Sequence, residues 1–401
     1  MNIIQINATY NIGSTGKIMA ELDDVINNSG YNGYMACGYY NPDNSKNVYF
    51  TNSKQPNTEI KKNILVSRIT GKMGYRKKHD TVSMIDWMDS INPDVVHLHN
   101  IHGDWLHIET LFTYLKEKRL PVVWTLHDCW AFTGRCSHFE MCGCNKWKSE
   151  CHSCTNNKVY PITYFFDYSR QMFRDKKKWF LEIKDMTIVT PSHWLASYVK
   201  ESYLGCYPVK VIHNGINTDV FSPTGNLSKY YSEVKEKKII LAVASSWSQT
   251  KGFDDIIRLD SLIDHDKYQI VIVGLNSRQM KAIPDTIIGV SRTNNQQELV
   301  ELYSGAYVFV NLTYQDNFPT TNLEALSCSL PIITYQTGGS PEAVVGNEGF
   351  VIEKGNVVAV LDAIEHVNTV DRSLCRRIAI QRFNKYERYH DYIELYDRLM
   401  R

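Results

Sequence analysis

Residues 306–336, AYVFVNLTYQDNFPTTNLEALSCSLPIITYQ, contain two β-branched runs separated by a polar loop and a short helical pattern. The runs Ala306–Leu312 and Pro331–Gln336 have the length of buried strands, and Thr320–Cys328 has the apolar spacing of a helix. A helix that joins two buried strands is typical of a βαβ unit, in which the strands are parallel. This stretch therefore predicts a parallel sheet.

The same alternation of strand-like and helix-like segments runs along the whole chain. In the first half, strands are expected at Asn2–Asn7, Gly33–Gly38, Asp94–His99, Pro121–His127, Thr187–Pro191 and Lys210–His213. In the second half, they are expected at Lys238–Ser245, Tyr268–Gly274, Thr286–Val290, Ala306–Leu312, Pro331–Gln336 and Phe350–Glu353. The predicted fold class is α/β, with two Rossmann-like, doubly wound parallel-sheet domains.

The segment 214–236 is the predicted boundary between the two domains. It is rich in Gly, Asn, Ser, Pro and charge, and it lacks periodic apolar residues. The expected domains are residues 1–214 and 215–375, and residues 376–401 have the pattern of a further helix. Because open α/β sheets bind ligands at the carboxyl ends of their strands, two such domains would bind ligands in a cleft between those ends.

The composition of the 401-residue chain excludes several classes of protein. Lys and Arg number 44 and Asp and Glu number 43, so the net charge is +1, whereas nucleic-acid-binding domains carry a strong basic excess. No apolar run approaches the ~18 residues of a membrane span. The first residues, MNIIQINATY, lack the features of a signal peptide. These observations predict a cytoplasmic protein with no nucleic-acid partner.

A glycine-containing turn follows the first expected strand. Gly13, Ser14, Thr15 and Gly16 precede a helical pattern, where glycines allow close approach of the backbone and free amides favour an anion. The alternative is a tight turn with Ser as the helix cap. The run matches neither a Walker loop nor a dinucleotide fingerprint.

Several histidines follow expected strands of the first domain. His127 and Asp128 come directly after the apolar run PVVWTL, where a histidine can donate a hydrogen bond to a sugar hydroxyl or a phosphate. The alternative is a histidine that only orients the loop. His97, His99 and His102 end a neighbouring strand, and one or two of them are further candidates for the binding edge.

The most specific motif joins a strand to a helix in the second half. Asp316 lies on the loop and Glu324 about one turn into the helix, so both carboxylates can point toward the carboxyl edge of the sheet. One carboxylate can accept from two neighbouring hydroxyls, and the amides at a helix start suit a diphosphate. The residues between the two carboxylates are the further candidates for substrate binding: Asn317, Phe318, Pro319, Thr320 and Thr321.

These motifs together resemble retaining glycosyltransferases of family 4. The segment Asp316–Glu324 is similar to the E-x7-E signature of that family, with Asp in place of the first Glu. The other matching segments, in the same order as in the family, are GSTG at 13–16, His127, HNGIN at 213–217, TKG at 250–252 and GGSPE at 338–342. The segments HLHNIHG and WTLHDCWAFTG-x-C resemble the bacterial exopolysaccharide and colanic-acid-type subgroup.

The resemblance implies a GT-B fold, in which two Rossmann-like domains face each other across a cleft and the C-terminal helix crosses back to the first domain. The first domain would bind the acceptor and the second a nucleoside-diphosphate sugar. Glu324 would hold the ribose, Asp316 the transferred sugar and Lys251 the diphosphate. Gly13 to Gly16 would lie beside the diphosphate, and His127 would contact the sugar near the reacting carbon.

The sequence differs from the family at two positions where relatives often carry a cationic side chain. Ser246 and Thr250 stand where relatives often carry Arg, so Lys251 would act alone on the diphosphate or with another cation such as Arg278 or Arg292. The predicted activity is retaining transfer of a sugar from a UDP- or GDP-sugar to a saccharide or lipid-linked acceptor in bacterial surface polysaccharide synthesis. The alternatives are a nucleotide-sugar 2-epimerase and a non-catalytic, zinc-stapled saccharide-binding subunit.

Six of the ten cysteines lie within one short stretch, which we interpret as an insertion at about 129–160. A dense thiol cluster in a chain without a secretion signal favours a metal over disulfides. Cys136, Cys144, Cys151 and Cys154 are the predicted ligands of a structural zinc. Free or disulfide-linked cysteines and an iron–sulfur or redox role are the alternatives, and no catalytic metal is expected.

Two basic segments of the first domain are candidates for contact with an anionic membrane. Residues 61–78 read KKNILVSRITGKMGYRKK, and Arg170–Lys184 forms a second basic and aromatic segment. Basic amphipathic helices bind anionic lipid surfaces, which would place the protein at the inner face of the membrane. A solvated surface helix explains the same pattern.

Overall fold

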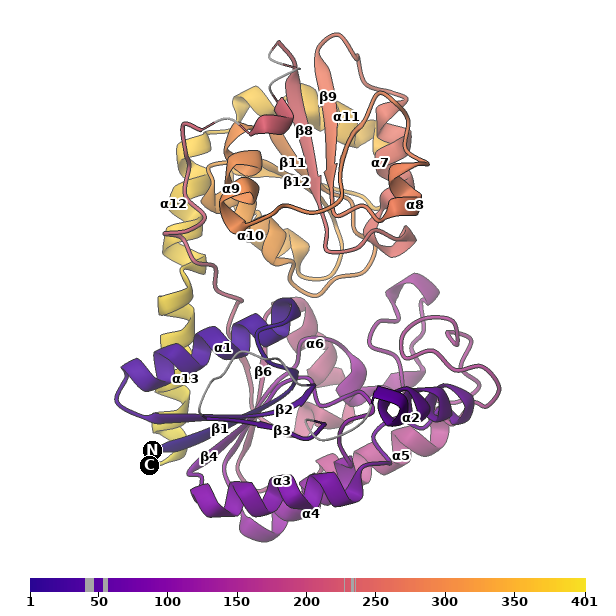
Figure 1. Ribbon diagram of the computed structural model, residues 1–401, viewed down its shortest axis with the longest axis vertical. Coiled ribbons are helices and arrows are strands. Elements are labelled where there is room, and N and C mark those ends of the chain that lie inside the picture. Colours follow the sequence, from indigo (N-terminus) through magenta and orange to yellow (C-terminus); the bar gives the residue numbers. More distant parts are fainter. Residues whose placement is uncertain (40–46, 53–56, 227, 232–233, 235) are drawn as a thin grey trace. The chain divides into compact units, whose positions relative to one another are not determined.

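The computed structural model describes residues 1–39, 47–52, 57–226, 228–231, 234 and 236–401. The chain forms two compact units. The first unit comprises Met1–Ile212 together with Tyr389–Arg401, and the second comprises His213–Arg388. Both units are α/β structures built on a fully parallel sheet, as the alternating pattern predicts (Figure 1).

The first unit contains a seven-stranded sheet in the order β3-β2-β1-β4-β5-β6-β7. The strands are β1 (Asn2–Thr9), β2 (Asn32–Tyr39), β3 (Val48–Phe50), β4 (Val95–Leu98), β5 (Val122–Thr125), β6 (Met186–Thr190) and β7 (Val209–Val211). The helices are α1 (Gly13–Asn28), α2 (Asn57–Thr70), α3 (Lys78–Ile91), α4 (Ile108–Lys118), α5 (Ser169–Phe180) and α6 (His193–Glu201).

Both faces of this sheet are buried, which explains why its strands are continuous apolar runs. Because successive side chains of a strand point to opposite faces, Ile3 packs with α1 and the end of the chain, whereas Ile4 packs with α3 and α4. The carboxyl ends of β1, β4 and β5 lie at one edge of the sheet.

The second unit contains a six-stranded sheet in the order β10-β9-β8-β11-β12-β13. The strands are β8 (Lys238–Val243), β9 (Tyr268–Val273), β10 (Ile288–Val290), β11 (Val308–Asn311), β12 (Ile332–Tyr335) and β13 (Gly349–Ile352). The helices are α7 (Phe253–Asp260), α8 (Ser277–Met280), α9 (Gln296–Gly305), α10 (Thr320–Ser327), α11 (Val357–Glu365) and α12 (Arg372–Phe383), and α13 (Lys385–Leu399) begins in this unit and ends in the first.

The helical pattern after Asp371 is interrupted in the structure, so it forms α12 and α13 instead of one helix. The cause is the backbone of Ile216, which lies against the junction at Asn384. The Ile216 N–H donates to the Phe383 carbonyl oxygen at 2.7 Å, and the Lys385 N–H donates to the Ile216 carbonyl oxygen at 2.9 Å. These bonds replace the intrahelical hydrogen bonds at the junction. The domain limits expected at residues 214 and 375 stay a prediction.

The basic run at 61–78 is not one helix. Helix α2 ends at Thr70, residues 71–77 are not helical, and α3 begins at Lys78. Gly71 has φ +68° and Gly74 has φ +85°, a left-handed backbone conformation that interrupts a helix. In the part of the chain that the structure describes, none of the helices has the length and apolarity to span a bilayer.

Candidate active site

Lys251 and Asp316 form an ion pair at the carboxyl edge of the second sheet. The Lys251 Nζ atom donates to Asp316 Oδ2 at 2.5 Å, and the two side chains are 36% and 22% exposed. Lys251 follows β8 and Asp316 follows β11, and these strands are neighbours in the sheet. The pairing therefore brings together two of the residues that the sequence assigned to one site.

The loop that carries Lys251 is fixed to the loop after β11 by backbone contacts. The Thr250 carbonyl oxygen accepts from the Tyr314 N–H at 2.8 Å and from the Thr313 hydroxyl at 3.1 Å. Gly252 has φ +71°, and a Cβ there would lie 2.0 Å from the Leu312 carbonyl oxygen. The glycine is thus required for the close approach of the two loops.

The loop before α10 is held from the other side by Gly338 and Gly339. A Cβ on Gly338 would lie 1.8 Å from the Asp316 carbonyl oxygen, and the Gly339 N–H donates to the Asn317 carbonyl oxygen at 2.6 Å. The side chains of Asn317 and Phe318 are only 4% exposed, and Pro319 is buried. Any ligand contact of these three residues would therefore use mainly backbone atoms.

Glu324 is oriented by a buried tyrosine that the sequence did not single out. The Tyr303 hydroxyl, on α9, donates to Glu324 Oε2 at 2.9 Å, and Tyr303 itself is fully buried. Burial and the neighbouring carboxylate raise the pKa of Tyr303 well above its usual value, so its hydroxyl keeps the proton that it donates. Glu324, Thr320 and Thr321 are half-buried, so the first turns of α10 are accessible there.

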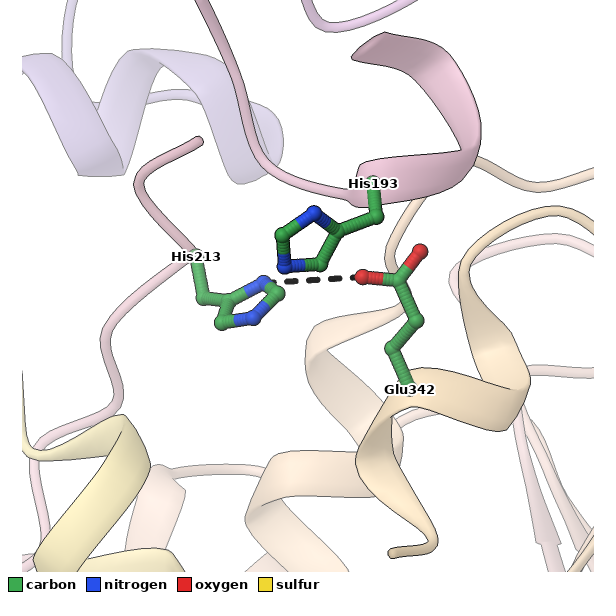
Figure 2. Close-up of side chains that lie close together, drawn as sticks. All are labelled: His193, His213 and Glu342. Carbon is green, nitrogen blue, oxygen red and sulfur yellow. Dashed lines mark ion pairs between the residues drawn. The ribbon is translucent and has the colours of Figure 1, made fainter. Parts of the chain in front are cut away.

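The segment HNG at 213–215, one of the segments that resemble the family, contacts this loop. The His213 ring stacks on Phe318 with a centroid separation of 4.8 Å, and its Nδ1 atom lies 4.0 Å from Glu342 Oε2 (Figure 2). The Asn214 side-chain amide donates to the Phe318 carbonyl oxygen at 3.2 Å. The cationic candidates Arg278 and Arg292 are both exposed and follow β9 and β10, respectively.

His127 in the first unit is hydrogen-bonded to a second histidine. Its Nε2 atom lies 3.1 Å from His99 Nδ1, and His99 Nε2 lies 3.2 Å from Gln5 Oε1. The Gln5 amide nitrogen donates to the Met19 carbonyl oxygen at 3.1 Å, which leaves Gln5 Oε1 as the acceptor. His99 therefore donates through Nε2 and accepts through Nδ1, so neutral His127 carries its proton on Nε2.

The histidines beneath His127 are kept neutral by burial. Burial lowers the pKa of His127 to about 4, against the opposing effect of Asp128. Burial and the neighbouring histidines lower the pKa values of His97 and His99 well below the usual value. His97 and His99 are 0% and 1% exposed, so both support the site from within the core, and His99 also lines a small hollow beside His127. His97 pairs separately with Tyr396 at 2.6 Å and with Thr125 at 2.8 Å.

Asp128 anchors the segment that follows His127. Its carboxylate accepts from the Trp130 N–H at 2.8 Å and lies 3.0 Å from His102 Nε2. Burial raises the pKa of Asp128, but His102 and the Trp130 amide offset this effect, so the pKa lies below its usual value. The small hollow, of about 10 Å³, lies against this segment and is lined in part by His102, Trp124 and His127.

The turn at Gly13–Gly16 forms the first turn of α1. Ile12 is the N-cap residue, and no side chain caps the helix, so the alternative of a serine cap is wrong. Gly13 has φ +68° and is exposed with Ser14, while a Cβ on Gly16 would lie 2.9 Å from Thr9 Oγ1. The helix thus packs tightly on the end of β1, and its first turn remains accessible.

The cysteine-rich segment between β5 and α5 is only partly consistent with a zinc site. Cys136 and Cys154 have their sulfur atoms 4.0 Å apart, close to the spacing of about 3.8 Å in a tetrahedral thiolate site. Among the described residues, however, no three cysteine sulfurs lie within 4.8 Å of one another. Cys151 instead accepts from the Gly134 N–H at 3.1 Å. Coordination of one zinc ion by all four thiols would require Cys144 and Cys151 to move toward the other two, and the zinc site stays a prediction.

Two parallel-sheet Rossmann-like units, with these residues at the carboxyl edges of their sheets, define the GT-B class of glycosyltransferase. Residues 50–220 match the family described as Glycosyltransferase Family 4, and residues 228–382 match that described as Glycosyl transferases group 1. The chain belongs to glycosyltransferase family 4, as the motifs predicted.

Individual relatives are distant but extend over nearly the whole chain. The chain is 22% identical to the putative colanic acid biosynthesis glycosyl transferase WcaC of Escherichia coli, over 90% of this chain and 89% of that protein. Sucrose-phosphate synthase from Thermosynechococcus elongatus has a similar fold, with a TM-score of 0.71, 15% identity and coverage of 99% and 98%. Anabaena Alr3699/HepE in complex with UDP-glucose gives a TM-score of 0.64, 13% identity and coverage of 98% and 99%.

Proposed function

We propose that this glycosyltransferase moves a sugar, with retention of its anomeric configuration, from a UDP- or GDP-sugar to a saccharide or lipid-linked acceptor. The observation that carries the proposal is the pair between Lys251, after β8, and Asp316, in the loop that leads into α10. A cation, a carboxylate and the amides of a helix start form a suitable set of groups for a diphosphate joined to a hydroxyl-rich sugar.

In this proposal the second unit binds the donor. Lys251 stabilises the negative charge that grows on the diphosphate as the bond to the sugar breaks. Glu324, held by Tyr303, accepts from the two ribose hydroxyls through its carboxylate. Asp316 accepts from hydroxyls of the transferred sugar, and the amides at Thr320 and Thr321 interact with the phosphate oxygens.

The chemical step needs no separate base on the protein. The acceptor hydroxyl attacks the anomeric carbon on the side from which the diphosphate departs, and the leaving phosphate oxygen takes the acceptor proton. The bond from carbon to phosphate oxygen breaks and the new glycosidic bond forms, so charge and protons balance. The protein acts mainly by positioning the two substrates and by excluding water.

The first unit would supply His127 and the first turn of α1. His127 is neutral and half-buried beside a small hollow, where its imidazole is suited to contact a sugar hydroxyl. The first turn of α1 begins with the exposed residues Gly13 and Ser14, and the amides of a helix start are suited to an anionic phosphate. The likeness to a putative colanic acid biosynthesis glycosyl transferase supports a role in surface polysaccharide synthesis.

A thermal-shift panel of UDP-, GDP- and ADP-sugars tests the donor, because a ligand of the native state raises the melting temperature. We expect one nucleotide class to stabilise the wild type and to have much less effect on Glu324→Ala. The donor that binds is then supplied with saccharide acceptors, and NMR of the product reports the anomeric configuration. Inversion would refute retention, and conversion of the donor to an isomer without acceptor would refute the transferase.

A further inference from the structure

An unusually exposed group of aromatic side chains lies between the cysteine-rich segment and α5. Tyr164, Phe165, Phe166 and Tyr168, here called the aromatic loop, are 53%, 76%, 54% and 36% exposed. Single exposed apolar side chains are normal, but adjacent large ones mark an interaction site. The rings of Tyr164 and Phe165 lie 6.4 Å apart, and those of Phe166 and Tyr168 lie 6.2 Å apart.

The aromatic loop is attached to α2 and to the turn that follows it. The Tyr164 N–H donates to the Arg68 carbonyl oxygen at 2.8 Å, and the Thr163 hydroxyl donates to the Phe166 carbonyl oxygen at 3.0 Å. The Lys72 ammonium lies 4.4 Å from the centroid of the Tyr168 ring. The loop and α2 therefore belong to one surface of the first unit (Figure 1).

The accessible side of α2 is basic. Lys61, Leu65 and Arg68 follow one another at helical spacing and are all exposed, and Lys62 is exposed beside them. Glu59 is the one acidic side chain of this helix, at its first turn. Asp167 lies within the aromatic loop, but its carboxylate already accepts from the Cys154 and Ser169 N–H groups.

The second basic segment of the sequence has a different environment. On α5, Arg170 and Arg174 both pair with Glu150, at 3.3 and 2.5 Å. Lys176 is buried, and its ammonium lies 3.9 Å from the centroid of the Trp130 ring. Much of the positive charge of α5 is therefore paired with Glu150 or buried, whereas the positive charge of α2 faces solvent next to exposed aromatic rings.

We propose that the exposed side of α2 and the aromatic loop form a docking surface for an anionic lipid bilayer. Tyr and Phe side chains partition into the headgroup region of a bilayer, and lysine and arginine beside them are attracted to anionic headgroups. Anionic headgroups would supply negative charge opposite the exposed lysines and arginine of α2, whereas a second copy of this chain would bring the same positive charge to the contact. The charge therefore favours the lipid surface. The surface goes beyond the proposed transfer reaction and does not depend on it.

Sedimentation with vesicles, in the absence of any substrate, tests the surface. Wild type should bind phosphatidylcholine vesicles that contain phosphatidylglycerol, bind phosphatidylcholine alone far less, and dissociate as salt is raised. Each cation near an anionic surface contributes about fivefold, so Lys61→Ala/Lys62→Ala should reduce the partition coefficient roughly 30-fold. Phe165→Ser should reduce it about tenfold, because a large apolar side chain no longer leaves water.

Two matched controls locate the effect. Lys177→Ala/Lys178→Ala removes two exposed lysines from α5, and Val358→Ser removes an exposed apolar side chain from α11 in the second unit. Both variants should bind vesicles as the wild type does. Equal melting temperatures of all variants would show that each one is folded.

Three results would overturn the proposal. The first is failure of wild type to bind anionic vesicles. If the wild type is then found to be a dimer that Phe165→Ser converts into a monomer, the surface binds a second copy of the chain instead of lipid. The second is unchanged binding of the Lys61/Lys62 and Phe165 variants. The third is an equal loss in the Lys177/Lys178 control. Donor binding, measured separately by thermal shift, distinguishes failure of this surface from failure of the transferase.

Discussion

Buried His97 should make the stability of the first unit depend on pH, and its replacement should remove a defined part of that dependence. His97 is fully buried, and burial lowers its pKa well below the usual value of about 6.5. Between these two pKa values the unfolded chain binds a proton that the folded protein does not, so stability falls as the pH falls. From pH 7 to pH 5.5 this single group should cost about 1.2 kcal/mol.

The His97→Gln variant tests that magnitude, because an amide can both donate and accept but does not titrate. Its stability at pH 7 will differ from that of wild type, since the bonds to Thr125 and Tyr396 change. The loss between the two pH values, however, should be about 1.2 kcal/mol smaller than in wild type, because distant titrating groups contribute equally to both proteins and the adjacent His99 stays buried in both.

Urea unfolding followed by tryptophan fluorescence is a suitable assay, because every tryptophan except Trp247 lies in the first unit. His79, on α3, is exposed in the folded protein, so His79→Gln is the matched control and should keep the wild-type loss. If His97→Gln and wild type lose the same stability between pH 7 and pH 5.5, His97 is not held neutral by burial and the reasoning fails.

Three further predictions concern the donor site and the cysteines. Glu324→Ala should weaken nucleotide binding by about 1.5–3 kcal/mol in calorimetry, because the ribose loses a charged acceptor. An unchanged Kd would show that Glu324 does not bind the ribose. Lys251→Met should lower kcat at saturating donor far more than it lowers the melting temperature. Normal turnover would instead favour Arg278 or Arg292 as the cation that stabilises the diphosphate. Elemental analysis of protein prepared without chelators should find about one zinc per chain if Cys144 and Cys151 move toward the Cys136–Cys154 pair, and zinc-free protein would contradict that site.

Much of the fold could be predicted from the sequence because parallel strands buried on both faces are continuous apolar runs. The expected strands correspond to twelve of the strands described, with ends that differ by a few residues. Strand β3 (Val48–Phe50) was missed because a three-residue edge strand has too few positions for a pattern. The break at Asn384 was missed because its cause, Ile216, lies far away in the sequence.

The candidate site was predictable where the chemistry lies within one motif. The Asp316–Glu324 spacing indicated two carboxylates on one loop and helix, and the structure adds the Lys251 contact. The supporting residues could not be found in that way, because strand pairing and helix packing bring them together. Gln5 and His99 nevertheless left a signal, since each is a polar residue within or at the end of a buried apolar strand.

The discontinuous first unit has a consequence for the way the protein is made. The segment Tyr389–Arg401 completes the first unit but follows the whole second unit in the sequence, so the first unit is completed only after the second has been synthesised. Until then, the face of the first sheet that contains Ile3 and Val95 lacks the covering of Tyr392 and Tyr396. A chain truncated before Tyr389 would therefore keep the second unit and expose the core of the first unit to chaperones and proteases.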